Sequence, residues 1–477
     1  MKITLGVVRG ISYGVFGPPD TFVPQARSLG ATLVRAYVYW AQVEPSPGHY
    51  DWSAVDALLD QLGGTAAWLT VCSSSRWGTR VPTDFQPPSP ALDDSAYERF
   101  VGALVRRCAG RIRYWQANNE PSNTGLLWSG TAGEYVHQLE LFARAVRTAD
   151  PSARVVLGGC GYDVLASPPG SPQRDFFDEL ARSGRDAFDL FSVHLYDDPH
   201  RVPEHLETAR GFMRAHGYER PLVAGEHNGP TLFDFPAATA ELERSMAAAF
   251  AAPDGGPVRM STEELAAQVA AETPDRRALR DLYARRDELP PELRLFLADE
   301  PAPTQALRDR IAGRQLAQRV LLALAGGVDT LVCWSLAPEV PDYADPYNVM
   351  DLMFGRLPLM DFAGGRIARV RPEGEAHRRL AGLLHGADGV DRIDVGDPDL
   401  FAFRIHCDSG PDRLAVWARG DVLAEGPPPR PVRLPWAAER ATAVDVLGAA
   451  RPLRCADGTV SLLADGTPVF VTAEVER

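Results

Sequence analysis

Eight short apolar runs, separated by helical stretches, constrain the fold of this chain more than any other feature. Most of the runs lie about 30–45 residues apart, the length that one strand, one helix and their loops occupy. The runs are Ile3–Val8, Thr32–Tyr39, Ala66–Val71, Ile112–Ala117, Arg154–Gly158, Leu190–Leu195, Leu222–Gly225 and Thr330–Trp334. Eight such units predict an α/β fold, a TIM (β/α)8 barrel whose parallel sheet closes on itself.

One interval in this pattern is too long. Between Glu226 and Trp334 the chain has roughly 70 residues more than a single βα unit needs. A capping box at Ser261 and a Thr273-Pro274 helix start predict a helical insertion at about residues 236–303, followed by a barrel helix at about 305–325. Because strand-to-helix loops lie on the active-site face of a barrel, we expect the insertion to overhang that face as a lid or a dimer contact. A solvated decoration without a role is the alternative.

The pattern changes after a last predicted helix near Glu373–Leu384. Short alternating strands with turn signals follow, which predicts a barrel domain at residues 1–385 and a small all-β sandwich at residues 386–477. The predicted strands are Leu400–His406, Arg413–Ala418, Pro431–Pro435, Ala441–Leu447, Val460–Leu463 and Pro468–Ala473.

Charge and local motifs exclude several functional classes. A formal net charge of −14 repels phosphate backbones and anionic lipid, so nucleic acid and membrane surfaces are not expected partners. The N-terminus lacks the features of a secretory signal, which favours a cytoplasmic location, and no run of 18 apolar residues predicts a membrane span. With neither a P-loop nor a G-x-G-x-x-G motif, we expect no nucleotide cofactor.

Two glutamates end predicted strands. Glu120 follows the fourth run in Asn118-Asn119-Glu120-Pro121, and Glu226 follows the seventh. A carboxylate at the C-terminal end of a barrel strand points into the site. Retaining glycosidases need two carboxyls about 5–5.5 Å apart, one protonated to act as the acid and one ionised to act as the nucleophile. The pair therefore predicts the catalytic residues of such an enzyme.

This pair resembles the signature of clan A glycoside hydrolases, barrel enzymes with an acid/base glutamate on strand four and a nucleophile on strand seven. The segment Trp40–Trp52 is similar to the W-x-x-x-E-P-x-x-G-x-Y-D-W stretch of several clan families. The stretch Asn348–Asp361 and the all-β domain look most like family 39. The segment Gly225–Gly229 departs from the more usual threonine-glutamate-aromatic pattern.

The resemblance also implies substrate-binding residues. It places Asn119 on the sugar 2-hydroxyl, Arg35 on strand two, His194 and Tyr196 beside the nucleophile, and Trp334 under the sugar as a stacking platform. Arg35 could instead form a structural ion pair, and His194 could be a satisfied buried histidine.

Further candidate substrate contacts are Trp40, Trp77 and Asn228, although tryptophans also supply much of any core. A metal is not expected, because His194, His200 and His205 lack the helical spacing of zinc enzymes and prolines interrupt their segment.

The sequence therefore predicts a retaining glycoside hydrolase without a cofactor. Its expected substrate is a small β-linked (equatorial) glycoside or oligosaccharide, cleaved by double displacement on Glu120 and Glu226. The alternatives are a transglycosylase on the same site, a lyase, and a barrel that binds carbohydrate or scaffolds a complex without turnover. A homo-oligomer is a further open alternative.

Overall fold

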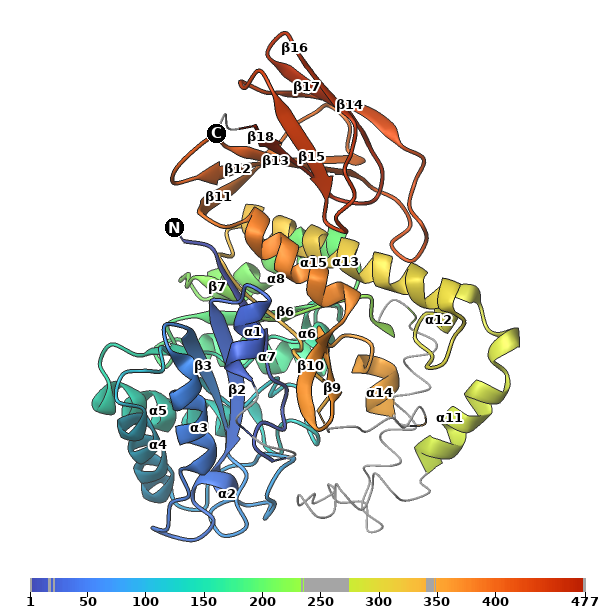
Figure 1. Cartoon of the computed structure of the whole chain (residues 1–477). Coiled ribbons are helices and arrows are strands. Elements are labelled where there is room, and N and C mark those ends of the chain that lie inside the picture. Colours follow the sequence, from blue (N-terminus) through green and yellow to red (C-terminus); the bar gives the residue numbers. More distant parts are fainter. Residues whose placement is uncertain are drawn as a thin grey trace.

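The computed structural model describes residues 2–15, 19, 22–232, 235, 274–339, 347 and 349–474. It confirms the predicted barrel of eight parallel strands, which neighbour one another in the order β5-β4-β3-β2-β1-β8-β7-β6 (Figure 1). The strands are β1 Thr4–Val8, β2 Leu33–Tyr39, β3 Ala66–Cys72, β4 Tyr114–Ala117, β5 Arg154–Val156, β6 Phe191–Leu195, β7 Leu222–His227 and β8 Thr330–Cys333. Each overlaps one of the eight predicted runs.

The barrel closes between β5 and β6. These two strands meet through isolated parallel bridges, Val156 with Leu190 and Cys160 with Val193, in place of a continuous ladder. Three glycines after β5, at positions 158, 159 and 161, interrupt the strand. Glycine in a strand marks a bend or a close backbone approach, and this loop runs directly past the candidate site.

Amphipathic helices surround the sheet. They are α1 Val23–Ser28, α2 Trp40–Val43, α3 Ser53–Leu62, α4 Asp94–Cys108, α5 Ala132–Ala149, α6 Tyr162–Leu165, α7 Pro172–Ser183, η1 Pro199–Arg201 and α8 Val202–Ala215. Local sequence fixes their starts: Thr131 and Glu134 form a reciprocal capping box at α5, and the Asp93 side chain caps α4. None of the described helices is long and apolar enough to cross a membrane.

The segment between β7 and β8 contains α11 Pro274–Ala284, η3 Arg286–Glu288, α12 Pro291–Arg294 and α13 Ala302–Ala325. The last of these is the expected seventh barrel helix. The capping box at Ser261 lies outside the described residues. Leu279 and Phe296 of the insertion are buried against Ile311 of α13 and against Leu352 of α14 Val349–Phe354, which follows β8. The described part of the insertion therefore packs on the barrel's own elements.

A β-hairpin and a helix lead from the barrel to the C-terminal region. The hairpin is β9 Met360–Ala363 and β10 Arg366–Val370, and the helix is α15 Pro372–Leu383. Two antiparallel sheets follow, in the strand orders β11-β12-β13-β18-β15 and β14-β17-β16. Their strands are β11 Ala387–Ile393, β12 Leu400–Cys407, β13 Arg413–Ala418, β14 Arg430–Pro435, β15 Ala441–Asp445, β16 Leu453–Ala456, β17 Thr459–Ala464 and β18 Val469–Ala473.

Six of these eight strands match predicted runs, and the sequence reading missed β11 and β16. Both lack the alternation that was used to find strands: β11 buries only Ala387 and Val390, and the four residues of β16 are half-buried or exposed. Such strands are held by pairing with their neighbours, β12 and β17, more than by their own apolar side chains.

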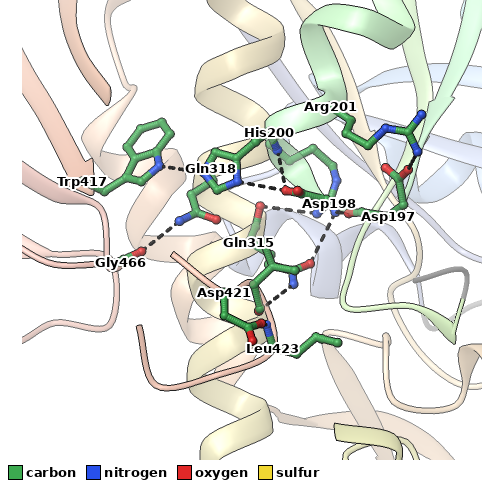
Figure 2. A network of polar contacts seen from close by, with 12 residues as sticks. Asp197, Asp198, His200, Arg201, Gln315, Gln318, Trp417, Asp421, Leu423 and Gly466 are labelled. Atoms are coloured by element: carbon green, nitrogen blue, oxygen red, sulfur yellow. Dashed lines mark hydrogen bonds and ion pairs between the residues drawn. The ribbon is translucent and has the colours of Figure 1, made fainter. Parts of the chain in front are cut away.

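The sandwich lies over α13 and α15 (Figure 1). Figure 2 shows the polar contacts that join it to the barrel. The Trp417 indole donates to His200 Nε2 at 3.2 Å, and Gln318 Nε2 of α13 donates to the carbonyl of Gly466 at 2.8 Å. His200 in turn pairs through Nδ1 with Asp198 at 2.9 Å. A loop next to the end of β6 is thereby tied to the sandwich.

Candidate active site

The structure brings Glu120 and Glu226 together at the carboxyl end of the barrel strands. One carboxyl oxygen from each and one ring nitrogen of His194 all lie within 4.8 Å of one another. Glu120 follows β4, where the backbone of Asn118 and Glu120 takes positive φ angles of 51° and 39°. Non-glycine residues rarely adopt this left-handed conformation, and they do so preferentially at functional sites.

Glu226 is buried and held by several donors. Its Oε1 accepts from Arg35 Nη1 at 3.0 Å and from the Tyr37 hydroxyl at 2.9 Å, while Oε2 accepts from the Tyr196 hydroxyl at 2.8 Å. Burial alone would raise the pKa of Glu226, but the charges of His194 and Arg35 and the two tyrosine hydrogen bonds outweigh it and lower that pKa. Glu226 is therefore ionised near neutral pH.

Arg35 organises this half of the site from inside the barrel. Its guanidinium is fully buried and donates through Nη2 to Asn119 Oδ1 at 2.7 Å and to the Tyr37 hydroxyl at 2.8 Å. Its Nε donates to Thr70 Oγ1 at 3.0 Å. The fork geometry of an arginine suits several acceptors at once, so this one side chain fixes the positions of Glu226, Tyr37 and Asn119.

Glu120 has a different environment. Its side chain is 18% exposed, against 6% for Glu226, so it is the more exposed of the two. Its Oε1 lies 2.5 Å from His194 Nδ1, and the same ring nitrogen lies 3.4 Å from Glu226 Oε2. His194 thus bridges the two carboxyls, and Glu120 is the one with more access to solvent.

Glycines allow the backbone to approach these groups. A Cβ added to Gly159 would lie 2.1 Å from His194 Nε2, and one added to Gly161 would lie 2.9 Å from Glu120 Oε1. Both distances are shorter than any real contact of a Cβ atom. The loop after β5 therefore packs directly against His194 and Glu120 in a way that only glycine permits.

Trp334 follows β8 and lies at the edge of the same site. It is 9% exposed and meets the ring of Tyr37 edge-on at 6.4 Å and the ring of Phe354 at 6.5 Å. Asn228 is fully buried, and its Nδ2 donates to the carbonyls of Trp334 and Leu357. Asn228 is therefore positioned to hold the backbone of Trp334 rather than to present its own amide to a substrate.

The two other tryptophan candidates, Trp40 and Trp77, contact each other and Glu44. Trp40 is fully buried, stacks on Phe100 at 5.2 Å, and donates its indole N–H to Glu44 Oε2 at 2.8 Å. Trp77 is half-buried, meets Trp40 edge-on at 5.1 Å, and donates to the Glu44 carbonyl. The structure thus places Trp40 in the core and leaves only Trp77 with surface that a ligand could reach.

Comparisons with solved structures show the same architecture in known enzymes. A family 39 glycoside hydrolase from the gut symbiont Bacteroides cellulosilyticus WH2 matches with a TM-score of 0.64 at 13% identity, over 99% of this chain and 81% of that one. The fold is that of family 39 glycoside hydrolases. A family 39 β-xylosidase from Caulobacter crescentus matches with a TM-score of 0.57 at 14% identity, over 99% of this chain and 95% of that one.

The likeness in fold extends across the clan. A family 51 α-L-arabinofuranosidase from Bifidobacterium longum matches with a TM-score of 0.55 at 12% identity, over 98% of this chain and 95% of that one. No protein-family model matches the sequence, and neither does any curated protein. The chain therefore shares the fold of these barrels with little of their sequence.

The donor atoms of Glu120, His194 and Glu226 are close enough together to hold a metal ion. Glu226, however, already accepts hydrogen bonds on both oxygens, and its Oε1 pairs with the positive charge of Arg35. Both oxygens of Glu226 are therefore already held by protein donors. The other two histidines of the segment point elsewhere, His200 to Asp198 and His205 to Asp197.

Sequence reasoning missed two contributors to this site, Tyr37 and the glycine loop after β5, and also Asp163, whose Oδ1 lies beside Gly161 as Glu120 Oε1 does. Tyr37 could have been found, because it lies two residues after Arg35 in one strand and so shares its face of the sheet. The run Gly158-Gly159-Cys160-Gly161 after a strand is also a readable signal of close backbone approach. Asp163 has no such signal.

Proposed function

We propose that this protein is a retaining glycoside hydrolase that cleaves a small β-linked (equatorial) glycoside by double displacement. The observation that carries the proposal is the approach of the Glu120 and Glu226 carboxyl oxygens to within 4.8 Å. Retaining enzymes hold their carboxyls about 5–5.5 Å apart, whereas inverting enzymes leave about 6.5–9.5 Å for a water molecule.

The different environments of the two carboxyls support the division of roles. Glu226 is buried, paired with Arg35 and has a lowered pKa, which suits a nucleophile. Glu120 is partly exposed, and its nearest charged partner is the titratable ring of His194, which suits an acid that becomes a base.

The reaction then has two balanced steps. In the first, Glu226 forms an ester bond to the anomeric carbon while the bond to the leaving oxygen breaks and Glu120 gives its proton to that oxygen. In the second, Glu120 takes a proton from water, the oxygen of that water attacks the anomeric carbon, and the ester bond to Glu226 breaks. The two inversions restore the original configuration, and both carboxyls return to their starting states.

A terminal sugar is the substrate that the surroundings of the site favour. Phe354 of α14 lies against Trp334, and Leu352 of the same helix packs in one apolar cluster with Leu279 of the insertion. The described part of the insertion thus supports the helix α14, which lies beside Trp334, the proposed sugar-stacking residue. A walled site accepts the end of a glycan more readily than its interior, so we propose exo action.

The test is a screen of aryl glycosides with the wild type, Glu226→Ala and a matched control. Glu219→Gln is the control, because Glu219 is an exposed glutamate just before the opposite end of β7. We expect turnover by the wild type and the control, and a loss of at least about a thousandfold in Glu226→Ala. Turnover that survives in Glu226→Ala would contradict the assignment.

Product analysis separates the alternatives. Azide added to Glu120→Ala should restore turnover and give a glycosyl azide of the same configuration as the substrate, whereas azide on Glu226→Ala should give the opposite configuration. Sugar–sugar products in excess of free sugar would identify a transglycosylase, which uses the same two steps with a sugar in place of water. Binding without turnover would identify a scaffold or carbohydrate-binding barrel.

A further inference from the structure

A third carboxyl group lies next to Glu120, on the loop that closes the barrel. Asp163 belongs to α6, two residues after the glycine loop, and its Oδ2 accepts a hydrogen bond from Ser122 Oγ at 3.0 Å. A Cβ added to Gly161 would lie 2.4 Å from Asp163 Oδ1 and 2.9 Å from Glu120 Oε1, so the two carboxyl oxygens share the space above one glycine.

The carboxyl group of Asp163 has no ion-pair partner among the described residues. No ion pair links Asp163 to a basic side chain in the part of the chain that the structure describes. Four titratable or charged groups act on Asp163 or lie around it. They are Glu120 after β4, His194 on β6, Cys160 in the glycine loop and Arg174 on α7. Of these, Arg174 is occupied with the backbone carbonyls of Val164 and Leu165.

Two neighbouring carboxyls of this kind titrate together. Burial and the negative charge of Glu120 raise the pKa of Asp163 to about 7. Ionising both groups at once places like charges a few ångströms apart, so the pair holds one proton to higher pH than a single carboxyl would.

We propose that Asp163 is a positioning residue that shares one proton with Glu120 and so keeps that proton available to the acid up to a higher pH. This inference rests on the proposed function, in which Glu120 must arrive protonated and must recover a proton after each turnover. Ser122 holds one oxygen of Asp163, and the absence of a side chain at Gly161 leaves room for the other oxygen beside Glu120 Oε1. The falling limb of activity at high pH then belongs to the Glu120–Asp163 pair, not to Glu120 alone.

The test is the pH profile of kcat/KM for Asp163→Asn. The amide has the same shape and can still hydrogen-bond to Ser122, but it carries no charge. The Glu120 carboxylate is then easier to form, so we expect the basic limb to move to lower pH by about one unit. Asp175→Asn is the matched control, because Asp175 is an exposed aspartate on the neighbouring helix α7, and it should leave the profile unchanged.

A comparison of substrates with different leaving groups shows whether Asp163 acts on the proton of Glu120 or only supports the structure. A dinitrophenyl glycoside needs no acid to release its leaving group, so Asp163→Asn should cleave it as the wild type does between pH 7 and 8. The rate of cleavage of a phenyl glycoside in the same pH range should fall about tenfold, because a basic limb that moves by one pH unit lowers the rate on that limb by this factor. Equal losses on both substrates would overturn the inference, and so would an unmoved basic limb.

Failure of this inference is distinguishable from failure of the proposed function. A wild type that turns over no aryl glycoside contradicts the function itself. An active wild type, an inactive Glu226→Ala and an unshifted Asp163→Asn contradict only the role of Asp163. If Asp163→Asn does not fold, Asp163→Ala carries the same expectation, because it also removes the charge.

Discussion

Replacement of Arg35 by methionine would test how the barrel interior supports the site. Methionine keeps much of the aliphatic length of arginine but removes the guanidinium. The change leaves Glu226 buried without its ion pair of 3.0 Å, and it removes a donor from Asn119 Oδ1 and from the Tyr37 hydroxyl. Thr70 Oγ1 and the carbonyl of Gly225 also lose a donor. The change thus combines an uncompensated buried charge with four acceptors that lose a hydrogen bond.

The magnitude follows from this geometry. Removing one partner of a buried ion pair costs about 3–5 kcal/mol, and we expect the free energy of unfolding at pH 7 to fall by that amount. The pKa of Glu226 is lowered in the folded protein, so its contribution to stability is present above the unfolded pKa of about 4.3 and is lost as the pH falls through the folded pKa. The difference between the two proteins should therefore shrink at low pH.

Urea unfolding at pH 7 and at lower pH would measure this difference, and the pH profile of kcat/KM would report on the site. Loss of the positive charge raises the pKa of Glu226, so the acid limb should move to higher pH. Arg107→Met is the control, because Arg107 pairs with Asp56 on the surface, where solvent screens the charges, and its replacement should change neither measurement. An Arg35→Met protein as stable as the wild type, with an unmoved acid limb, would refute the reasoning.

Other substitutions test the remaining roles. Glu120→Ala should flatten the basic limb of kcat/KM, and a variant that kept the wild-type limb would show that Glu120 is not the acid. Trp334→Ala should raise KM for aryl glycosides, whereas Trp40→Ala should leave KM unchanged and lower the free energy of unfolding by about 3–5 kcal/mol, as denaturation would measure. Gly159→Ala should push His194 from its place, lowering kcat and destabilising the protein by about 1–3 kcal/mol; unchanged kcat would contradict the close packing of that loop.

Much of the barrel could be predicted because its signal is periodic. Each strand lies between helices and is buried on both faces, so its sequence is a short continuous apolar run. Eight such runs at a common spacing are compatible with few folds other than a (β/α)8 barrel. The approach of Glu120 and Glu226 to each other was predictable for a related reason. The topology of the barrel brings the carboxyl ends of β4 and β7 to one face. The positions of Glu120 and Glu226 at strand ends were therefore enough to predict that they lie on that face.

The supporting residues were harder to predict, because their roles depend on tertiary contacts. Trp40 lies within a motif typical of clan members, yet the structure buries it on Phe100. Asn228 follows β7, the strand that carries Glu226, yet its amide donates to two backbone carbonyls. Asp163 acquires its significance only from the approach of two loops across Gly161, a distance that spacing along the chain does not encode.

The C-terminal sandwich shows how one strand can belong to two cores. In β12, Leu400 and Ala402 face the interior of the sandwich, while Phe401 and Phe403 join the large core formed with the barrel. Because neighbouring side chains of a strand point to opposite faces, a strand packed on both sides must be apolar at every position. The run Leu-Phe-Ala-Phe meets this condition.

Trp417 on β13 stacks on both phenylalanines of this run and donates its indole N–H to His200. Packing and hydrogen bonding therefore join the sandwich to the loop beyond β6, the strand that carries His194.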